Sequence, residues 1–254
     1  MTPTNKIALV TGGSRGLGKD MALNLAKKGN HVIITYNSQQ GAAQEVVSAI
    51  EKQGLKAAAL QLNTGAVEGF DKFVEALKST LQTTFNATQL HYLVNNAGTG
   101  VHQSFATTTE AQFDELVNIH LKGVFFLTQK LLPVIADGGA IVNVSSGLAR
   151  FSTPGYSAYA AMKGAIEVLT RYMAKELGAR GIRANIIAPG AIETDFAGGT
   201  VRDNAQVNAQ IASQTALGRV GLPEDIGSVV AFLCSDDARW VTAQRVEASG
   251  GMFL

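Results

Sequence analysis

The sequence predicts an α/β protein, a single doubly wound domain with a mostly parallel seven-stranded sheet and helices on both faces. Short apolar runs alternate with longer amphipathic stretches along the chain, which is the pattern of parallel strands joined by crossover helices. The runs are apolar at almost every position, as expected of strands whose two faces are both covered. The length of 254 residues fits one such domain, and no linker, low-complexity segment or internal repeat divides it.

The strands are predicted where the apolar runs are short and lie between turn residues. In chain order they are Ile7–Val10, His31–Tyr36, Ala57–Leu62, Leu90–Val94, Ala140–Val144, Ile182–Ala188 and Arg245–Ala248. The helices expected between them cover residues 16–28, 42–53, 67–84, 110–132, 157–179, 195–215 and 223–233. The ligand of a doubly wound sheet sits beyond the carboxyl ends of the strands, so site residues are expected directly after them.

Composition and charge exclude several classes of protein. Lys plus Arg is 21 and Asp plus Glu is 20, and this balance indicates no nucleic-acid partner. Cys234 is the single cysteine, so no intrachain disulfide forms, and it is expected to be buried. The polar start at residues 1–6 has no signal-peptide pattern and no apolar stretch is long enough to span a bilayer, which predicts a cytoplasmic protein with no membrane partner. No metal site is expected.

A glycine-rich turn directly follows the first predicted strand and opens the first predicted helix. It reads Thr11-Gly-Gly-Ser-Arg-Gly-Leu-Gly18. Glycines at this point let the chain turn tightly and bring its backbone close to a pyrophosphate, which the helix N-terminus stabilises. This context predicts a Rossmann-type dinucleotide site rather than a purely structural turn. The residues expected to bind the dinucleotide here are Gly12, Ser14, Arg15, Gly16, Leu17 and Gly18.

The end of the second predicted strand indicates which dinucleotide is preferred. NAD-binding folds carry an acidic residue there for the ribose 2′-hydroxyl, whereas this chain has Asn37 and Ser38. A 2′-phosphate meets no repulsion at this place, and Arg15 is placed to pair with it. We therefore expect NADP(H) to be preferred over NAD(H), with Asn37 and Ser38 donating neutral hydrogen bonds. The alternative for Arg15 is a solvated surface charge.

Ser146, Tyr159 and Lys163 form the predicted catalytic set. Ser146 ends the fifth predicted strand, and Tyr159 and Lys163 lie four residues apart on one face of the next helix. A free tyrosine titrates near ~10, and a neighbouring ammonium is expected to lower that pKa. Tyr159 then exchanges a proton with a carbonyl or alcohol oxygen, to which the Ser146 hydroxyl donates a hydrogen bond. An ordinary helix pair is the alternative for Tyr159 and Lys163 taken alone.

These motifs together resemble those of the short-chain dehydrogenase/reductase (SDR) family, and the resemblance covers essentially the whole chain. Residues 11–18 resemble the family's T-G-x-x-x-G-x-G, residues 95–98 its N-N-A-G and residues 189–194 its P-G-x-x-x-T. The resemblance implies an oxidoreductase of the NADP-dependent carbonyl or 3-oxoacyl reductase type, assembled as a homotetramer or dimer. It adds these residues to the expected cofactor site: Asn63, Thr64, Asn96, Ala97, Gly98, Tyr159, Lys163, Pro189, Gly190, Ile192 and Thr194.

The chain departs from the family at the fourth catalytic position. Aligned on Leu-Lys-Gly-Val-Phe, residues 121–125, His120 stands where the family has an Asn that holds a proton-relaying water. Asn118 is two residues early and points about 200° away on a regular helix. We hypothesise that His120 takes over the relay and adds a titration around pH 6–7. The alternative is a histidine that only packs and forms hydrogen bonds. A second departure is Ala243, where Gly is common.

The expected substrate is a small apolar ketone or aldehyde. The residues predicted to flank the pocket are Leu148, Phe151, Tyr156, Ile192 and Phe196. Asp137 stands where carrier-protein reductases often have basic residues and would repel an acidic carrier, although Arg180 remains a possible contact. A 3-oxoacyl thioester reductase is therefore the second choice, and a non-catalytic NADP(H) sensor is the third. Residues 1–145 are expected to hold the cofactor and residues 146–254 to carry catalysis and the substrate.

Overall fold

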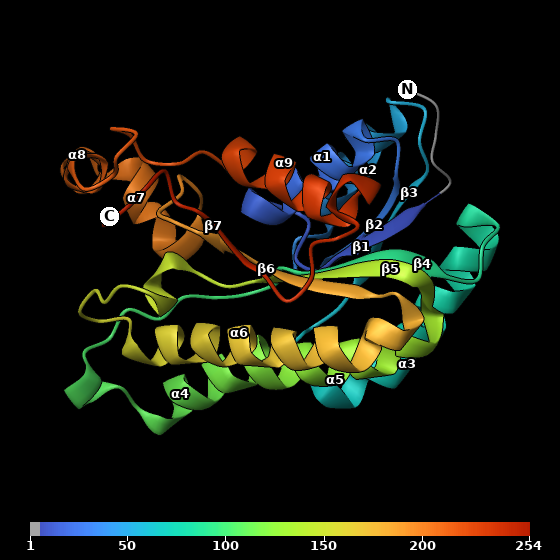
Figure 1. Cartoon of the computed structure of the whole chain (residues 1–254), viewed down its shortest axis with the longest axis horizontal. Coiled ribbons are helices and arrows are strands. Elements are labelled where there is room, and N and C mark those ends of the chain that lie inside the picture. The colour runs from blue at the N-terminus through green and yellow to red at the C-terminus, as the bar shows by residue number, and fades with distance from the viewer. Residues whose placement is uncertain (1–5) are drawn as a thin grey trace.

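The computed structural model describes residues 6–254, which form one seven-stranded sheet with helices on both faces (Figure 1). All neighbouring strands run parallel in the order β3-β2-β1-β4-β5-β6-β7, which confirms the predicted doubly wound α/β fold. The strands are β1 Ile7–Val10, β2 His31–Tyr36, β3 Ala57–Gln61, β4 Leu90–Asn95, β5 Ile135–Val144, β6 Arg183–Pro189 and β7 Arg245–Ala248. The strand order reverses between β1 and β4, where such folds bind ligands. The polar start expected at residues 1–5 lies outside the described residues.

Helices form two layers around the sheet, with α1, α2 and α9 on one face and α3, α5 and α6 on the other (Figure 1). The helices are α1 Gly16–Lys27, α2 Gln40–Glu51, α3 Phe70–Thr80, α4 Glu110–Val117, α5 Gly123–Leu131, α6 Ser157–Leu177, α7 Thr200–Asp203, α8 Ala205–Ser213 and α9 Pro223–Cys234. The long helix expected over 110–132 is interrupted by a π-helical turn, Asn118–Lys122, which carries His120. The helix expected over 195–215 is broken into α7 and α8.

Strand β5 begins five residues earlier than the sequence indicated. Ile135 pairs with Leu90, and the register then shifts so that Ala140 pairs with Tyr92. The extra residues contain Gly138, whose φ is +75°, and Gly139, at which a Cβ would lie 2.6 Å from the carbonyl oxygen of His91. Asp137-Gly-Gly was expected to lie before the strand, whereas these glycines form an irregularity within it.

The core consists of two apolar layers, one on each face of the sheet. Alternate residues of β1 divide between them, because Ala8 and Val10 face α1, α2 and α9, whereas Ile7 and Leu9 face α3, α5 and α6. Cys234 is buried in the first layer, as predicted, and burial raises the pKa of its thiol to about 12. No helix within residues 6–254 is long and apolar enough to cross a membrane.

A buried polar network crosses the second layer directly beneath the site. The Asn95 side-chain amide at the end of β4 donates to Thr128 on α5 (3.0 Å) and to Asn143 Oδ1 on β5 (2.8 Å). Asn143 in turn donates to Thr170 on α6 at 2.8 Å. Each amide is satisfied in a place that water does not reach, so the network fixes β4, β5, α5 and α6 relative to one another.

Candidate active site

One cavity of about 890 Å³ opens at the carboxyl ends of the strands and gathers every residue that the sequence placed in the site. These are Gly12, Ser14, Arg15, Gly16, Leu17, Gly18, Asn37, Ser38, Asn63, Thr64, Asn96, Ala97, Gly98, His120, Ser146, Tyr159, Lys163, Pro189, Gly190, Ile192 and Thr194. They come from segments spread between positions 12 and 194 and meet at the switch point of the sheet, where the strand order predicts a ligand. No group of three or more metal-ligating side chains occurs within residues 6–254.

The glycine-rich turn has a backbone that only glycine allows. Gly12 has φ +64°, and a Cβ there would lie 2.9 Å from Cα of Ala97. At Gly18, in the first turn of α1, a Cβ would lie 2.2 Å from the carbonyl oxygen of Gly12. The turn is therefore packed tightly against its neighbours and presents bare backbone to the cavity. This is the shape that a pyrophosphate needs.

Thr11 joins this turn to the loop after β4. Its hydroxyl donates to the carbonyl oxygen of Val94 (3.3 Å) and accepts the backbone N–H groups of Asn96 (2.9 Å) and Ala97 (3.0 Å). The Asn96 side chain returns the contact by donating to the carbonyl oxygens of Thr11 (2.9 Å) and Gly12 (3.2 Å). The amide of Asn96 is thus used to hold two loops together.

The adenosine end of the cavity is polar and free of carboxylates. Arg15, Asn37 and Ser38 line it, and Arg15 is exposed and pairs with no acidic side chain within the described part of the chain. Asn63, which the family resemblance adds to the expected cofactor site, has a side-chain oxygen that can accept a hydrogen bond from a ligand. That oxygen already accepts the N–H of Gly65 at 2.9 Å, so one lone pair remains for a ligand.

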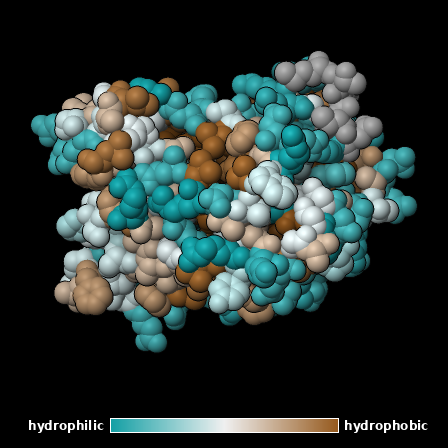
Figure 2. All heavy atoms as spheres, viewed as in Figure 1, coloured by the Kyte–Doolittle hydropathy of each residue, from teal (hydrophilic) through white to brown (hydrophobic). Residues whose placement is uncertain are grey.

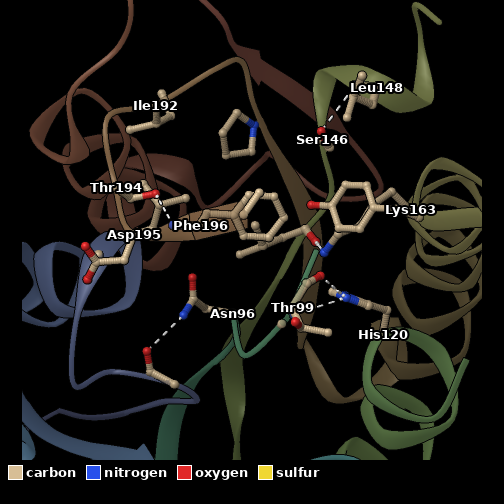
Figure 3. Close-up of a pocket in the computed structure, with 18 of the residues that line it drawn as sticks. Asn96, Thr99, His120, Ser146, Leu148, Lys163, Ile192, Thr194, Asp195 and Phe196 are labelled. Atoms are coloured by element: carbon tan, nitrogen blue, oxygen red, sulfur yellow. Dashed lines mark hydrogen bonds between the residues drawn. The ribbon is translucent and has the colours of Figure 1, made fainter. Parts of the chain in front are cut away.

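Ser146, Tyr159 and Lys163 meet where the polar end of the cavity joins its apolar end. Tyr159 and Lys163 are 7% and 5% exposed, and the Lys163 ammonium nitrogen lies 5.4 Å from the centre of the Tyr159 ring. Lys163 donates to the carbonyl oxygen of Val144 at 2.8 Å, which anchors helix α6 to the end of β5. Ser146 caps the next turn by accepting the N–H of Leu148 at 3.2 Å. Figure 3 shows Ser146 and Lys163 on the same side of the cavity.

The expected lowering of the Tyr159 pKa does not occur in this structure. Burial raises the pKa of Tyr159, and the nearby Ser146 hydroxyl opposes that rise only in part. Burial also lowers the pKa of Lys163 to about 7, so its positive charge is itself costly in this position. The physical reason is that neither group has a carboxylate or bulk water to stabilise its charged form.

His120 is buried at the bottom of the cavity, which confirms that it faces the site. Its Nε2 donates to the carbonyl oxygen of Thr99 at 2.7 Å, and its ring stands edge-on to Tyr159 with centroids 5.3 Å apart (Figure 3). Nδ1 is buried and has no hydrogen-bond partner among residues 6–254. The ring also lies on Gly98, where a Cβ would come within 2.6 Å of it.

The expected titration of His120 around pH 6–7 is wrong for this structure. Burial, followed by the charge of Lys163, lowers the pKa of His120 to about 3. The imidazole is therefore neutral at all physiological pH values. Asn118, on the same π-helical turn, is not among the residues that line the cavity, in agreement with its predicted direction.

The other end of the cavity is lined by the residues predicted to flank a substrate: Leu148, Phe151, Tyr156, Ile192 and Phe196. Phe196 lies near the centre of the cavity (Figure 3), with its ring 5.6 Å from that of Tyr159. It also packs on Gly100, where a Cβ would lie 2.5 Å from the ring. The lining on this side is mostly aromatic and aliphatic, which suits an apolar ligand.

The segment after β6 has a left-handed backbone at three successive residues. Gly198 and Gly199 have φ values of +75° and +76°, and Ala197 shares the left-handed conformation at +51°. Arg202 holds the segment together by pairing with Asp195 and with Asp203, in the latter case at 2.7 Å. This break in the helix was not expected, although the two glycines are its signal in the sequence.

A polar cluster behind Ser146 was not foreseen. The Ser145 hydroxyl donates to Glu167 Oε1 at 2.7 Å, and the same oxygen accepts from Arg245 Nε at 2.6 Å. Arg245 also donates to the backbone carbonyl of Ser146 at 3.3 Å. These residues lie up to 100 positions apart, so no local spacing in the sequence could have revealed them.

Comparison with known proteins agrees with this geometry. A family model described as enoyl-(acyl carrier protein) reductase matches residues 12–253. The short-chain dehydrogenase/reductase FrzI of Cladobotryum sp is 38% identical over 98% of this chain and 96% of its own. A 3-oxoacyl-(acyl-carrier-protein) reductase of Staphylococcus epidermidis is 36% identical over 98% of this chain and 100% of its own.

A solved structure is similar over nearly the same length. The angucycline C-6 ketoreductase LanV, crystallised with bound NADP, superposes with a TM-score of 0.93 at 38% identity and covers 98% of this chain and 96% of its own. The sequence match, the shared fold and the cavity at the switch point all lead to one family. The chain belongs to the short-chain dehydrogenase/reductase family of oxidoreductases.

Proposed function

We propose that this oxidoreductase reduces an apolar ketone or aldehyde to an alcohol with NADPH. The observation that carries the proposal is the meeting of Ser146, Tyr159 and Lys163 between a glycine-lined cradle and an aromatic-lined pocket. A cofactor in the cradle and a carbonyl in the pocket would therefore meet beside these three residues. The reverse reaction, in which the alcohol is oxidised, uses the same residues.

The cradle fits a nicotinamide dinucleotide, because the space at Gly12 and Gly18 admits bare backbone only. Arg15 supports a preference for NADP(H), since it is an exposed cation with no acidic partner in the described chain, at a place without carboxylates. The related ketoreductase LanV was crystallised with NADP. Residues 1–145 supply this cradle, and residues 146–254 add Pro189, Gly190, Ile192 and Thr194 beside the nicotinamide.

When bound, NADPH supplies the hydride that reaches the carbonyl carbon. Tyr159 donates its phenolic proton to the carbonyl oxygen, so that the C=O bond becomes CH–OH and the tyrosinate is left behind. Ser146 turns its hydroxyl toward the same oxygen and stabilises its developing negative charge. Lys163 stabilises the tyrosinate, and it holds the cofactor ribose once its ammonium turns from Val144 toward the cradle.

His120 supports the return of the proton to Tyr159. Since Nε2 is held by Thr99, the unpartnered Nδ1 is the acceptor that can fix a water molecule in the buried space near Lys163. A neutral imidazole serves this role without titrating near neutrality. Replacement by Asn, the usual family residue, is expected to preserve turnover, whereas His120→Leu removes the acceptor and slows kcat.

A homo-oligomer, tetramer or dimer, is the proposed assembly. Phe113 on α4, Phe125 on α5 and Tyr172 on α6 are 42%, 41% and 61% exposed. Helices α4 and α6 contact each other, and both contact the π-helical turn that leads into α5. Such an aromatic surface is typical of an interface. Light scattering coupled to size-exclusion chromatography measures the assembly, and a monomer at micromolar concentration would contradict it.

Reduction of a 3-oxoacyl thioester is the second candidate, favoured by the carrier-protein reductase among the relatives. The surface near Asp137 argues against an acidic carrier. Arg180, the cation that remained available, is paired with Asp137 at 2.7 Å and with the backbone carbonyls of Leu132 and Ile135. A non-catalytic NADP(H) sensor is the third candidate. The presence of the catalytic set argues against it.

The deciding experiment follows NADPH oxidation with a panel of free ketones, aldehydes and acyl thioesters. Wild type is compared with Tyr159→Phe, which keeps the ring and removes the acid, and with NADH as cofactor. We expect turnover of an apolar free carbonyl, a preference for NADPH and a loss of activity in the variant. Equal activity in Tyr159→Phe would overturn the mechanism, and binding of NADPH without turnover of any carbonyl would favour the sensor.

A further inference from the structure

Residues 249–254, here named the closing segment, border the substrate end of the cavity. Met252 and Phe253 line it directly. Arg150 holds both of them by their backbone, because its Nη2 donates to the carbonyl oxygen of Met252 at 2.7 Å and its Nη1 to that of Phe253 at 3.2 Å. The segment is therefore fastened through one guanidinium that lies about 100 positions away in the chain.

Glu247 fixes the orientation of that guanidinium. Its carboxylate accepts Arg150 Nε at 2.8 Å and Nη2 at 2.6 Å, which is the bidentate pairing that orients an arginine most firmly. Arg245 and Ser249 donate to the same carboxylate, each at 2.7 Å. Glu247 is therefore fully ionised at physiological pH, with the Arg150 contact first among the causes that lower its pKa to about 2.

The closing segment presents an aromatic ring to the cavity in a conformation that needs support. Phe253 has φ +54°, a left-handed conformation that side chains other than glycine rarely adopt. Its ring packs on that of Phe151 with centroids 4.8 Å apart, and the Arg150 guanidinium lies 5.3 Å from the centre of the Phe151 ring. Arg150 thus contacts the ring of Phe151 and the backbone of Phe253.

We propose that Arg150 is a specificity-determining residue, a latch that keeps Phe253 beside Phe151 as an aromatic wall selecting ketones with a fused aromatic ring. The inference rests on the proposed carbonyl reduction and names the substrate class of that site. Arg150 acts through the wall and touches neither the catalytic set nor the cofactor cradle.

The rest of the pocket matches such a substrate. Phe196 and Tyr156 add two more aromatic rings to the lining, and Leu148 and Ile192 add aliphatic surface. Offset and edge-to-face contacts between aromatic rings are favourable beyond the area they bury. Figure 2 shows hydrophobic residues among polar ones both at the end of the molecule that carries α7 and α8 and at the centre of this face, and Figure 1 places residue 254 beside that end. A small aliphatic ketone would leave most of this ring surface uncovered.

The test compares 2-tetralone with cyclohexanone, which differ by one fused benzene ring. In Arg150→Met we expect KM for 2-tetralone to rise roughly tenfold, because about one ring contact is lost, while kcat and the KM for NADPH change less than about twofold. The kcat/KM for cyclohexanone is expected to change less than about twofold as well. A uniform loss with both ketones would overturn the proposal.

Arg180→Met is the matched control. Arg180 also pairs with a carboxylate and two backbone carbonyls, yet it lies at the other end of β5, away from the cavity. This variant removes an equivalent set of bonds, so it should leave the ratio of the two kcat/KM values at the wild-type level. A shift of that ratio equal to the one in Arg150→Met would show a general loss of stability rather than a latch.

Phe253→Ala provides an independent variant that leaves the latch intact and removes only the ring. It should reproduce the rise in KM for 2-tetralone by itself, and adding Arg150→Met should raise KM little further, because both changes act on one wall. Additive effects would overturn the mechanism. Absence of any carbonyl turnover in wild type would refute the proposed function, whereas wild-type turnover with unaltered selectivity in both variants would refute the latch alone.

Discussion

At the scale of single residues, His120 shows what burial does to a polar side chain. Its Nε2 is satisfied by Thr99, but the ring is almost entirely removed from water and lies near Lys163. The neutral form is therefore strongly favoured in the folded protein. An unfolded histidine, in contrast, takes up a proton near pH 6.5.

This difference predicts that the free energy of unfolding falls as pH falls from 6.5 toward 3. In that window the unfolded chain binds a proton at position 120 and the folded protein does not, so stability is lost on acidification, by about 1 kcal/mol between pH 6.5 and 5.5 and by about 1.4 kcal/mol for each further pH unit. Urea unfolding at pH 6.5, 6.0 and 5.5 measures it. His120→Asn should flatten the slope by that amount. A slope in His120→Asn parallel to that of wild type would contradict the assignment.

Ala243 shows a strained backbone in a place where the family commonly has glycine. Its φ is +59°, and its N–H is committed to the carbonyl oxygen of Ala184 at 2.8 Å, which holds it there. Ala243→Gly should raise the free energy of unfolding by about 0.5–1 kcal/mol, because glycine adopts this conformation without strain. Thermal unfolding measures the gain. Ala49→Gly, in the last turn of α2, should change stability in the opposite direction, and a loss in both variants would refute the strain.

At the scale of elements, the polar network under the site joins four of them. Asn143→Ala leaves the Asn95 amide with Thr128 as its remaining side-chain partner and opens a small cavity. We expect a loss of about 2–4 kcal/mol in the free energy of unfolding, since a buried amide loses its partner. Chemical denaturation measures it. Thr170→Val removes only one bond of the same network and should cost less, and a larger cost there would contradict this ranking.

The elements also show how far sequence reasoning reaches. The strands and the glycine turn were predictable because their signals are local, in the periodicity of apolar residues and the spacing of three glycines. The π-helical turn at Asn118–Lys122 was not, because the pattern of a helix with one extra residue per turn still reads as a helix. The early start of β5 was missed because Asp137-Gly-Gly has the composition of a turn.

The predictions for the site show the same difference between features with a local sequence signal and features without one. Every predicted site residue lines one cavity, since each followed a strand or a motif. The electrostatic expectations for Tyr159 and His120 were wrong because burial, which spacing cannot give, exceeds the influence of neighbouring charges. Arg150 and Glu247 were missed because their partners lie about 100 positions away.

At the scale of the whole molecule, cofactor binding and folding are coupled. A ligand that binds only the folded protein stabilises it by about 2.7 kcal/mol at one hundred times its Kd, or roughly 5–10 °C in Tm for a chain of this size. NADP⁺ should therefore raise Tm more than NAD⁺ at equal concentration. Arg15→Gln should lower NADP⁺ affinity roughly tenfold and remove the difference. Lys19→Gln, an exposed cation one turn later, should retain it, and an equal response to both dinucleotides in wild type would refute the preference.

The hydrogen bonds of Thr11 determine how the cradle is ordered before the cofactor binds. One hydroxyl joins three backbone groups, one at the end of β4 and two in the loop after it, to the glycine turn, and Asn96 completes the connection from the other side. The cradle is thus preorganised by the protein's own hydrogen bonds, so little conformational entropy is lost when the dinucleotide arrives. The order that this region needs is supplied during folding rather than during binding. Association should therefore behave as docking to a rigid surface.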